Sequence, residues 1–227
     1  MPIDPNAETV VVALRNVPGF AHGLVRDLRV RWALEEIGRP YRTELHEAMT
    51  PRPDSYRQAW QPFGQVPALD DGQVRLFESG AILLHLGEQD ERLLPKEPQA
   101  RADALSWLIA ALNTIEPVIM DLVFIDVFRA RESWTREARP GTVDFLNARL
   151  AHLDAALADG GWIAGPFSIA DIMMVSILRT LRHTDILEAY PKLKAYKERG
   201  EVRPAFRQAL ADQSADLGEP IKFEIPA

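Results

Sequence analysis

The chain contains no cysteine among its 227 residues. Disulfide bonds and thiolate metal sites are therefore excluded. So is every mechanism that uses a cysteine of the protein as its nucleophile, such as those of the thioredoxins and glutaredoxins. If thiol chemistry takes place on this protein, the sulfur must arrive with a ligand.

The chain also lacks an excess of basic residues. Its 26 lysines and arginines stand against 33 aspartates and glutamates, which gives a formal net charge of −7 at pH 7. Because nucleic-acid binding needs a clustered positive surface, we expect no nucleic-acid partner.

Long apolar runs and targeting signals are missing from the pattern as well. No apolar run approaches the roughly 20 residues that span a bilayer, so we expect no membrane partner. The first residues, MPIDPNAET, lack the basic and apolar regions of a signal peptide. We therefore expect a cytoplasmic protein.

Metal-ligating patterns are absent too. His46, His85, His152 and His183 each lack a second histidine three or four residues away, and the chain offers no thiolate. These histidines therefore do not predict a metal site.

The hydrophobic pattern of residues 1–87 predicts a mixed α/β domain. Residues 9–14, TVVVAL, are β-branched and apolar and predict a buried strand. Residues 24–37 carry apolar side chains at helical spacing and are followed by Gly38, a helix stop signal. The remaining predicted elements are, in order, a strand at 41–45, one helical turn within 49–60, a hairpin of 66–69 and 74–77, and a helix at 79–87. The order βαβαββα is that of a thioredoxin-like domain.

Residues 88–98 predict a linker, and residues 99–227 predict an all-helical domain. The linker sequence, EQDERLLPKEP, is charged and contains two prolines. The helical pattern over 99–131 is interrupted at Pro117, which we expect to kink or split it. Pro140 is predicted to occupy the first position of the next helix.

Ser168-Ile169-Ala170-Asp171 is the best-marked helix start in the sequence. The serine and the acidic residue three positions later form a capping box, so we assign Asp171 to folding rather than to catalysis. The segment 212–227 is predicted to be a short polar tail that either folds over the body of the protein or stays loose.

Residues 61–82 carry the most information about function. A cis bond at Val66–Pro67 would leave the N–H and C=O of Val66 free to pair with an extended peptide. Ser79 opens a helix and offers its hydroxyl and unpaired backbone N–H groups to a carboxylate, while Glu78 beside it is placed for an ammonium group. The stretch therefore fits a zwitterionic amino-acid end joined to a short peptide backbone. Its alternative interpretation is an ordinary hairpin followed by a capped helix.

These residues resemble the glutathione transferase family. The family's glutathione site has the pattern N-P-x-G-K-V-P-x-L, then a hairpin, then E-S-x-A-I; here Gln61–Leu69 read QPFGQVPAL and Glu78–Ile82 read ESGAI. The resemblance implies a thioredoxin-like domain followed by an all-helical domain, a homodimer, and glutathione as co-substrate. It implies these glutathione-binding residues: Gln65, Val66, Pro67, Glu78 and Ser79.

The resemblance also implies roles for residues outside that stretch. Asp103 matches a position that in many relatives reaches the glutathione ammonium of the partner subunit. The alternative interpretation is that Asp103 is a solvent-exposed acidic residue of a helix. Phe20, Trp107 and Asn113 are expected walls of the electrophile pocket, which the family places between its two domains; their alternative is simple helix packing.

The segment that follows the first strand departs from the family pattern. The family activates the thiol with a hydroxyl donor at this place, but residues 15–26, RNVPGFAHGLVR, contain no serine, tyrosine or cysteine. Asn16 and His22 are the catalytic candidates that are left, with Arg15, Arg26 and Arg29 as nearby cations. Backbone N–H groups at the start of the next helix are a further alternative.

Two functions follow from these observations. The first is an enzyme, a glutathione transferase that conjugates reduced glutathione to an apolar electrophile or reduces peroxides with it. The second is a non-catalytic binding or regulatory protein of the same fold, which the missing hydroxyl motivates.

Overall fold

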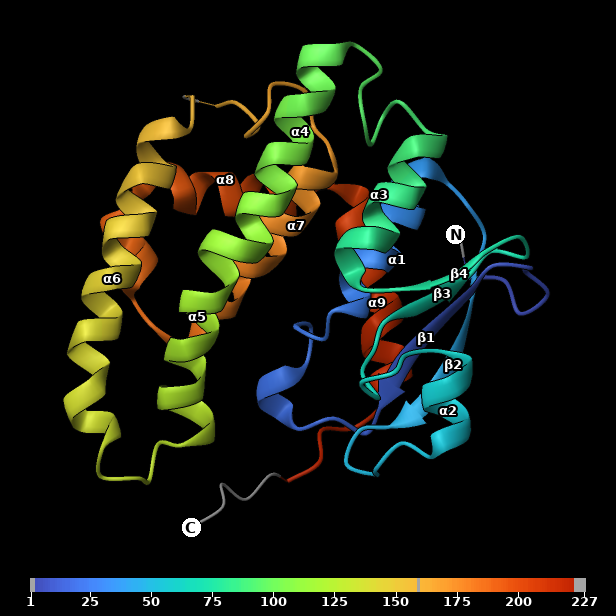
Figure 1. The fold of residues 1–227 in the computed structure, drawn as a ribbon, viewed down its shortest axis with the longest axis horizontal. Helices are drawn as coiled ribbons and strands as arrows, with labels where there is room; N and C mark the ends of the chain where they lie inside the picture. The colour runs from blue at the N-terminus through green and yellow to red at the C-terminus, as the bar shows by residue number, and fades with distance from the viewer. Residues whose placement is uncertain (1–2, 159, 223–227) are drawn as a thin grey trace. The chain divides into compact units, whose positions relative to one another are not determined.

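A computed structural model describes residues 3–158 and 160–222 (Figure 1). The chain forms two compact units. The first holds the described residues through Leu94 together with those from Val202 onward, and the second is Pro95–Glu201. The division differs from the predicted boundaries because the residues from Val202 onward group with the first unit.

A four-stranded sheet in the order β2-β1-β3-β4 is the centre of the first unit. β1 (Val10–Arg15) runs parallel to β2 (Arg42–Glu47), and antiparallel to β3 (Ala68–Asp70), which pairs in turn with β4 (Arg75–Phe77). Val10–Ala13 of β1 are buried, as the β-branched valines predict, and Leu14 is half-buried. The predicted thioredoxin-like order of strands is confirmed.

The helices of the first unit begin and end near the predicted residues. They are α1 (Asp27–Ile37), α2 (Asp54–Ala59) and α3 (Ser79–Gln89), with a short 3-10 segment at Gly19–Ala21. Gly38 ends α1 in the left-handed conformation (φ +68°), where its lack of a Cβ removes the steric cost.

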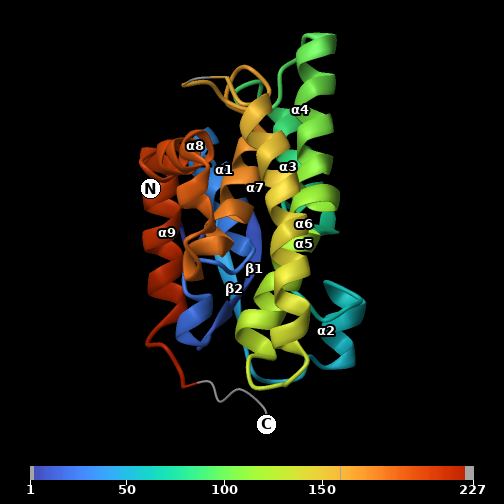
Figure 2. The same cartoon turned by 90° about the vertical axis from the view of Figure 1, so that its left-hand side faces the viewer.

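α9 (Pro204–Leu217) packs along α1 in the first unit (Figure 2). The rings of Trp32 and Phe206 meet edge to face with centroids 4.9 Å apart. The prediction that 212–227 is a polar tail is wrong for its first residues, because Gln213 and Leu217 continue the buried face of α9. Residues 223–227 of that prediction lie outside the described residues.

One long helix opens the second unit. α4 (Pro98–Ala110) passes through a π-helical segment, Ala111–Ile115, into α5 (Glu116–Val123), and a second π-helical segment follows at Phe124–Phe128. Pro117 does not split it. The helical hydrogen bonding changes immediately before the proline, where the Glu116 N–H donates to Ala111 O, five residues back. Such a π-bulge lets the helix continue past a proline that has no N–H to donate.

This helix also corrects the expectation that no apolar segment reaches membrane-spanning length. Pro98–Phe128 is long and apolar enough to cross a membrane by length and composition alone. Half of its most apolar stretch is buried within the protein, and a core helix of a soluble protein can have the same length and apolar composition.

The prediction for Pro140 is wrong. α6 spans Thr135–Ala156 and contains Pro140 in its interior rather than at its first position. A proline there leaves the carbonyl of Arg136 without its helical partner. Arg136 is exposed, so water can satisfy that carbonyl.

α7 (Ile169–Leu178) is the fully buried helix of the second unit, and its predicted capping box is confirmed. Two 3-10 segments, Arg179–His183 and Ile186–Ala189, connect it to α8 (Pro191–Glu201). The Asp171 carboxylate is completely buried and accepts hydrogen bonds from Ser168 N (2.9 Å), Ile163 N (2.9 Å) and the Tyr196 hydroxyl (2.8 Å). Asp171 thus joins the start of α7 to the preceding loop and to α8.

Candidate functional site

The five predicted glutathione-binding residues come together in one pocket of the first unit. Its lining residues are Arg26, Gln61, Gln65, Val66, Pro67, Glu78 and Ser79. The β3–β4 hairpin explains this, because Ala68 at the start of β3 pairs with Phe77 at the end of β4. The residues just outside this pair, Pro67 and Glu78, are therefore neighbours although 11 positions apart in the chain.

Ser79 is the first residue of α3 and lies against a buried arginine. Its side-chain oxygen accepts a hydrogen bond from Arg29 Nη1 of α1 (3.2 Å), and the two residues are only 3% and 4% exposed. The backbone N–H groups of the first helical turn have no acceptor within the helix, so this end of α3 is suited to an anion.

Glu78 is held in an unusual backbone conformation directly before α3. Its φ of +71° lies in a region that costs a residue with a side chain on the order of 1–3 kcal/mol. Its carboxylate is exposed and has no hydrogen-bond or ion-pair partner among residues 3–158 and 160–222. A strained residue with an unengaged charge at a pocket is typical of a binding site.

Val66 and Pro67 are joined by a cis peptide bond, as predicted. The segment is fixed from its N-terminal side, where Gln65 N donates to the buried Gln61 side chain (2.9 Å) and Gln65 O accepts from the Tyr56 hydroxyl (2.6 Å). Within the described part of the chain, the Val66 N–H and C=O have no hydrogen-bond partner. They are available to the backbone of an extended ligand.

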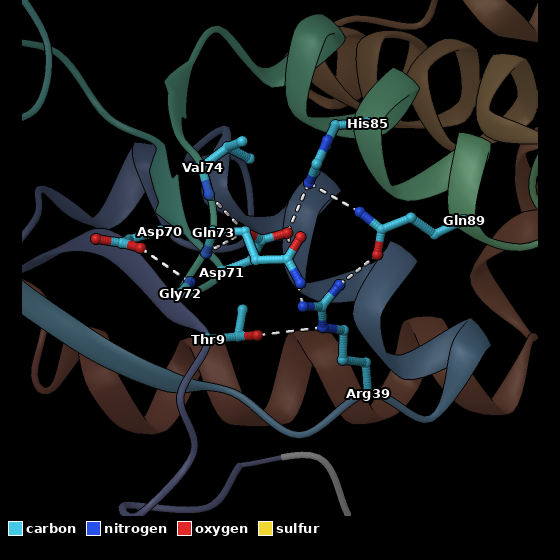
Figure 3. Close-up of polar contacts among 9 residues, drawn as sticks. All are labelled: Thr9, Arg39, Asp70, Asp71, Gly72, Gln73, Val74, His85 and Gln89. Carbon is cyan, nitrogen blue, oxygen red and sulfur yellow. Dashed lines mark hydrogen bonds and ion pairs between the residues drawn. The ribbon is translucent and has the colours of Figure 1, made fainter.

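The opposite end of the hairpin is anchored by Asp71 (Figure 3). Its carboxylate is 5% exposed and accepts from the backbone N–H groups of Gln73 (3.1 Å) and Val74 (3.0 Å). His85 of α3 lies 2.7 Å from the same group, and Arg39, just beyond α1, lies 3.6 Å away. Burial raises the pKa of Asp71, but the hydrogen bonds from His85, Val74 and Gln73 outweigh it and hold the pKa below its usual range.

Replacing Asp71 by asparagine is expected to lower the free energy of unfolding by about 1–3 kcal/mol at pH 7. Because the pKa of Asp71 is lower in the folded protein than in the unfolded chain, its stabilisation is present above about pH 5 and is lost as the pH falls below about 4. Urea unfolding of both proteins at pH 7 and pH 3 should show a smaller difference at pH 3.

Asp54→Asn is the control for this measurement, because the Asp54 side chain is 90% exposed and, within the described residues, pairs only with Arg57. It should change the free energy of unfolding by less than about 0.5 kcal/mol at either pH. A difference between Asp71→Asn and the unmodified protein that is equal at pH 7 and pH 3 would contradict the assigned role of the carboxylate.

The loop after β1 holds the two catalytic candidates apart from this pocket. Asn16 has a left-handed backbone (φ +53°), and its amide Nδ2 donates to Glu47 Oε2 of β2 (2.9 Å). Arg15 Nε donates to the other oxygen of Glu47 (2.6 Å). Hydrogen bonds from Asn16 and Arg15 lower the pKa of Glu47. The Asn16 amide is therefore already engaged by a carboxylate.

His22 follows the 3-10 segment of the same loop. Its Nε2 is buried and has no hydrogen-bond partner among the described residues. Neither His22 nor Asn16 lines the pocket at Ser79. Their part in thiol activation stays a prediction.

Two family models match the chain. They are described as the glutathione S-transferase N-terminal domain, over residues 28–89, and the glutathione S-transferase C-terminal domain, over residues 127–213. The disulfide-bond oxidoreductase YfcG of Escherichia coli K12 is 31% identical over 206 residues, which cover 82% of this chain and 89% of that protein. The chain belongs to the glutathione S-transferase family.

Other members of the glutathione S-transferase family agree with this assignment. Glutathione S-transferase F14 of Arabidopsis thaliana is 28% identical over 162 residues, 66% of this chain, and the match spans just 64% of that protein's length. A crystal structure of a glutathione transferase family member from Pseudomonas fluorescens, with two glutathione bound, has a TM-score of 0.73 at 28% identity and covers 89% of this chain and 92% of its own. The predicted family and its fold are confirmed.

The other residues that the glutathione S-transferase resemblance singled out lie in both units. Asp103 of α4 accepts a hydrogen bond from Gln99 of the same helix (2.8 Å). Trp107 is half-buried on α4, and Asn113 is exposed in the π-helical segment that follows. Phe20 belongs to the first unit and is 36% exposed. Their roles toward a substrate stay predictions.

The second unit has a cavity of its own, of about 290 Å³, among charged residues around α8. Three of its basic groups form ion pairs: Arg179 with Glu201 (2.8 Å), Lys197 with Glu201 (2.9 Å) and Lys194 with Glu188 (2.6 Å). Such neutralised pairs do not select a charged ligand.

No group of three or more potential metal ligands occurs among the residues that the structure describes.

Sequence reasoning missed three contacts that shape the candidate site. Tyr56 holds Gln65 O, Gln61 holds Gln65 N, and Arg29 holds Ser79. Gln61 stands at the first position of the family pattern and could have been found there. Tyr56 carries no local signal, and Arg29 was singled out as a cation near the thiol but not as a partner of Ser79, because only the fold brings each residue near the group it contacts.

Proposed function

We propose that this protein is a glutathione transferase that binds reduced glutathione in the pocket at Ser79 and conjugates it to an apolar electrophile. The observation that carries the proposal is the meeting of Val66–Pro67 with Glu78 and Ser79 at the start of α3, in a chain of the glutathione S-transferase family. Glutathione has a zwitterionic end and a short peptide backbone, which these residues fit, and it also carries a thiol.

Each end of the ligand has a counterpart in the pocket. The γ-glutamyl carboxylate is proposed to bind the Ser79 hydroxyl and the N–H groups of the first turn of α3, and the ammonium to pair with Glu78. The cysteinyl backbone would pair with the N–H and C=O of Val66, beside Gln65 and Pro67. Asp103 of the second subunit of a homodimer is proposed to add a contact to the same ammonium.

The reactive sulfur is that of glutathione, because the chain contains no cysteine. Its thiolate would form a C–S bond with the electrophilic carbon while the bond from that carbon to a leaving group breaks and the leaving group departs with the electron pair. Phe20, Trp107 and Asn113 are the proposed walls of the electrophile pocket. Reduction of a peroxide is part of the same proposal: the same thiolate would attack one peroxide oxygen, the O–O bond would break to release an alcohol, and a second glutathione would displace water from the sulfenic acid to give glutathione disulfide. Asn16 and His22 are the proposed donors to the sulfur, in a cytoplasmic protein.

A non-catalytic glutathione-binding protein is the second candidate. One observation favours it: the Asn16 amide is bound to Glu47, in a loop that has no serine, tyrosine or cysteine to take its place.

A titration of the bound thiol separates the two functions. Binding of reduced glutathione is measured first by calorimetry, and the thiolate absorbance of the complex is then followed against pH. An enzyme is expected to lower the thiol pKa by at least one unit from about 8.5, a preference of about 1.4 kcal/mol for the thiolate. A bound thiol with an unshifted pKa would rule out the transferase and leave the binding protein.

The same calorimetric titration checks the site. Ser79→Ala and Glu78→Gln should each weaken glutathione binding by about 1–3 kcal/mol, because each removes a hydrogen bond or ion pair to a charged group of the ligand. Asp54→Asn, on the exposed side of α2, is the matched control and should bind as the unmodified protein does. Unchanged affinity in both site variants would remove the assignment.

A further inference from the structure

The hydrogen bond between Arg29 and Ser79 fixes which way the serine hydroxyl faces. A guanidinium group has only donors and stays charged at any ordinary pH. Arg29 Nη1 lies 3.2 Å from Ser79 Oγ, so the serine oxygen must accept and one of its lone pairs is occupied. The hydroxyl hydrogen must then point away from the arginine.

Among residues 3–158 and 160–222 the Ser79 hydroxyl donates to no acceptor, so its hydrogen is available to a ligand in the pocket. Ser79 lines that pocket, and the backbone N–H groups at the start of α3 open toward the same end of the helix. Arg29 is 4% exposed and 50 positions from Ser79 in the chain, so its charge stands behind the serine rather than in the solvent. Ser79 is therefore presented to a ligand as a donor backed by a cation.

We propose that Arg29 is a positioning residue that turns the Ser79 hydroxyl into a hydrogen-bond donor and so makes the pocket selective for a carboxylate. The inference rests on the proposed binding of glutathione and adds to it the group that sets the specificity of the γ-glutamyl end. A neutral amide at the same place would bind less tightly than a carboxylate, because it is attracted less strongly by the buried positive charge.

The test is a double-mutant cycle on the whole protein, measured by calorimetry. The variants are Arg29→Met, Ser79→Ala and the double variant; the ligands are reduced glutathione and its analogue with the γ-glutamyl carboxylate converted to an amide. Arg29→Met is expected to weaken glutathione binding at least 10-fold, but less than 2-fold in the Ser79→Ala background. The amide analogue should bind Arg29→Met and the unmodified protein equally.

Arg29→Lys keeps a charge and a donor, and it is expected to restore most of the affinity that Arg29→Met loses. Arg29→Gln, which also lacks the charge, replaces Arg29→Met in the cycle if the methionine variant does not fold, as circular dichroism would show; a weakening that disappears in the Ser79→Ala background is then the supporting result. Arg42→Met, an exposed arginine on β2, is the control and should leave affinity unchanged.

The outcomes distinguish this inference from the function on which it rests. If the unmodified protein does not bind glutathione, both the proposed function and the inference about Arg29 are contradicted. If Ser79→Ala weakens binding but Arg29→Met does not, only the inference falls. Additive losses in the double variant, or an equal loss for the amide analogue, would likewise show that Arg29 does not act through Ser79 on a carboxylate.

Discussion

Asp171→Ala is expected to lower the free energy of unfolding by about 3–5 kcal/mol, because it leaves several buried donors without an acceptor at once. The lost acceptor serves two backbone N–H groups, those of Ser168 and Ile163, and the hydroxyl of Tyr196. Each unsatisfied buried donor costs roughly 1–3 kcal/mol, and loss of the capping box adds to this. Urea unfolding followed by circular dichroism measures the effect.

Asp171→Asn gives a graded test of the same explanation. The asparagine oxygen can still accept, but its NH₂ group faces donors where the second carboxylate oxygen stood, so an intermediate loss is expected. The control is Asp121→Asn, an exposed aspartate of α5, for which a change below about 0.5 kcal/mol is expected. If Asp171→Ala behaved like that control, the buried hydrogen bonds would not stabilise the second unit.

Arg31→Met is expected to destabilise the first unit by about 3–5 kcal/mol, the usual cost of removing one partner of a buried ion pair. The Arg31 side chain is fully buried and bonds Asp27 (2.7 Å) and Asp216 of α9 (2.7 Å). Gln213 of α9 donates to the other oxygen of Asp27 (2.8 Å). Without the guanidinium, a buried carboxylate is left with a single side-chain donor. Thermal and urea unfolding both report the loss.

Two further variants test the cause of that loss. In the double variant Arg31→Met/Asp27→Asn the uncompensated charge is gone, while the asparagine still accepts from Gln213, so much of the stability should return. Arg207→Met, on the exposed face of α9, is the matched arginine control and should be nearly neutral. Equal destabilisation by the single and the double variant would mean that packing, rather than charge, explains the effect.

The features that the sequence predicted correctly depend on neighbours in the chain. Gly38 ends α1 because of its own backbone freedom, and the pair Ser168 and Asp171 caps α7 within one turn. The cis bond at Val66–Pro67 was likewise expected from a local pattern, and a hairpin with a short turn is enough to bring it beside Glu78–Ser79.

The features that the sequence did not predict depend on partners far along the chain. The docking of α9 on α1 joins Arg31 to Asp216, which are 185 positions apart. The conformation of the loop after β1 is set by Glu47 on β2 and by Leu217, whose carbonyl accepts from Asn16 N (3.0 Å). No pattern within residues 15–26 contains those partners, which is why the thiol-activating group could not be chosen from the sequence.

The position of α9 in the first unit has a consequence for the order in which the protein is made. Its helix is synthesised after all of Pro95–Glu201, yet it supplies Phe206 against Trp32 and Asp216 against Arg31. While the ribosome is still translating the helical unit, Arg31 of α1 has Asp27 of its own helix but lacks its second partner, Asp216, and the face of α1 that Phe206 contacts is uncovered. The unit that is started first is thus the one that is completed last.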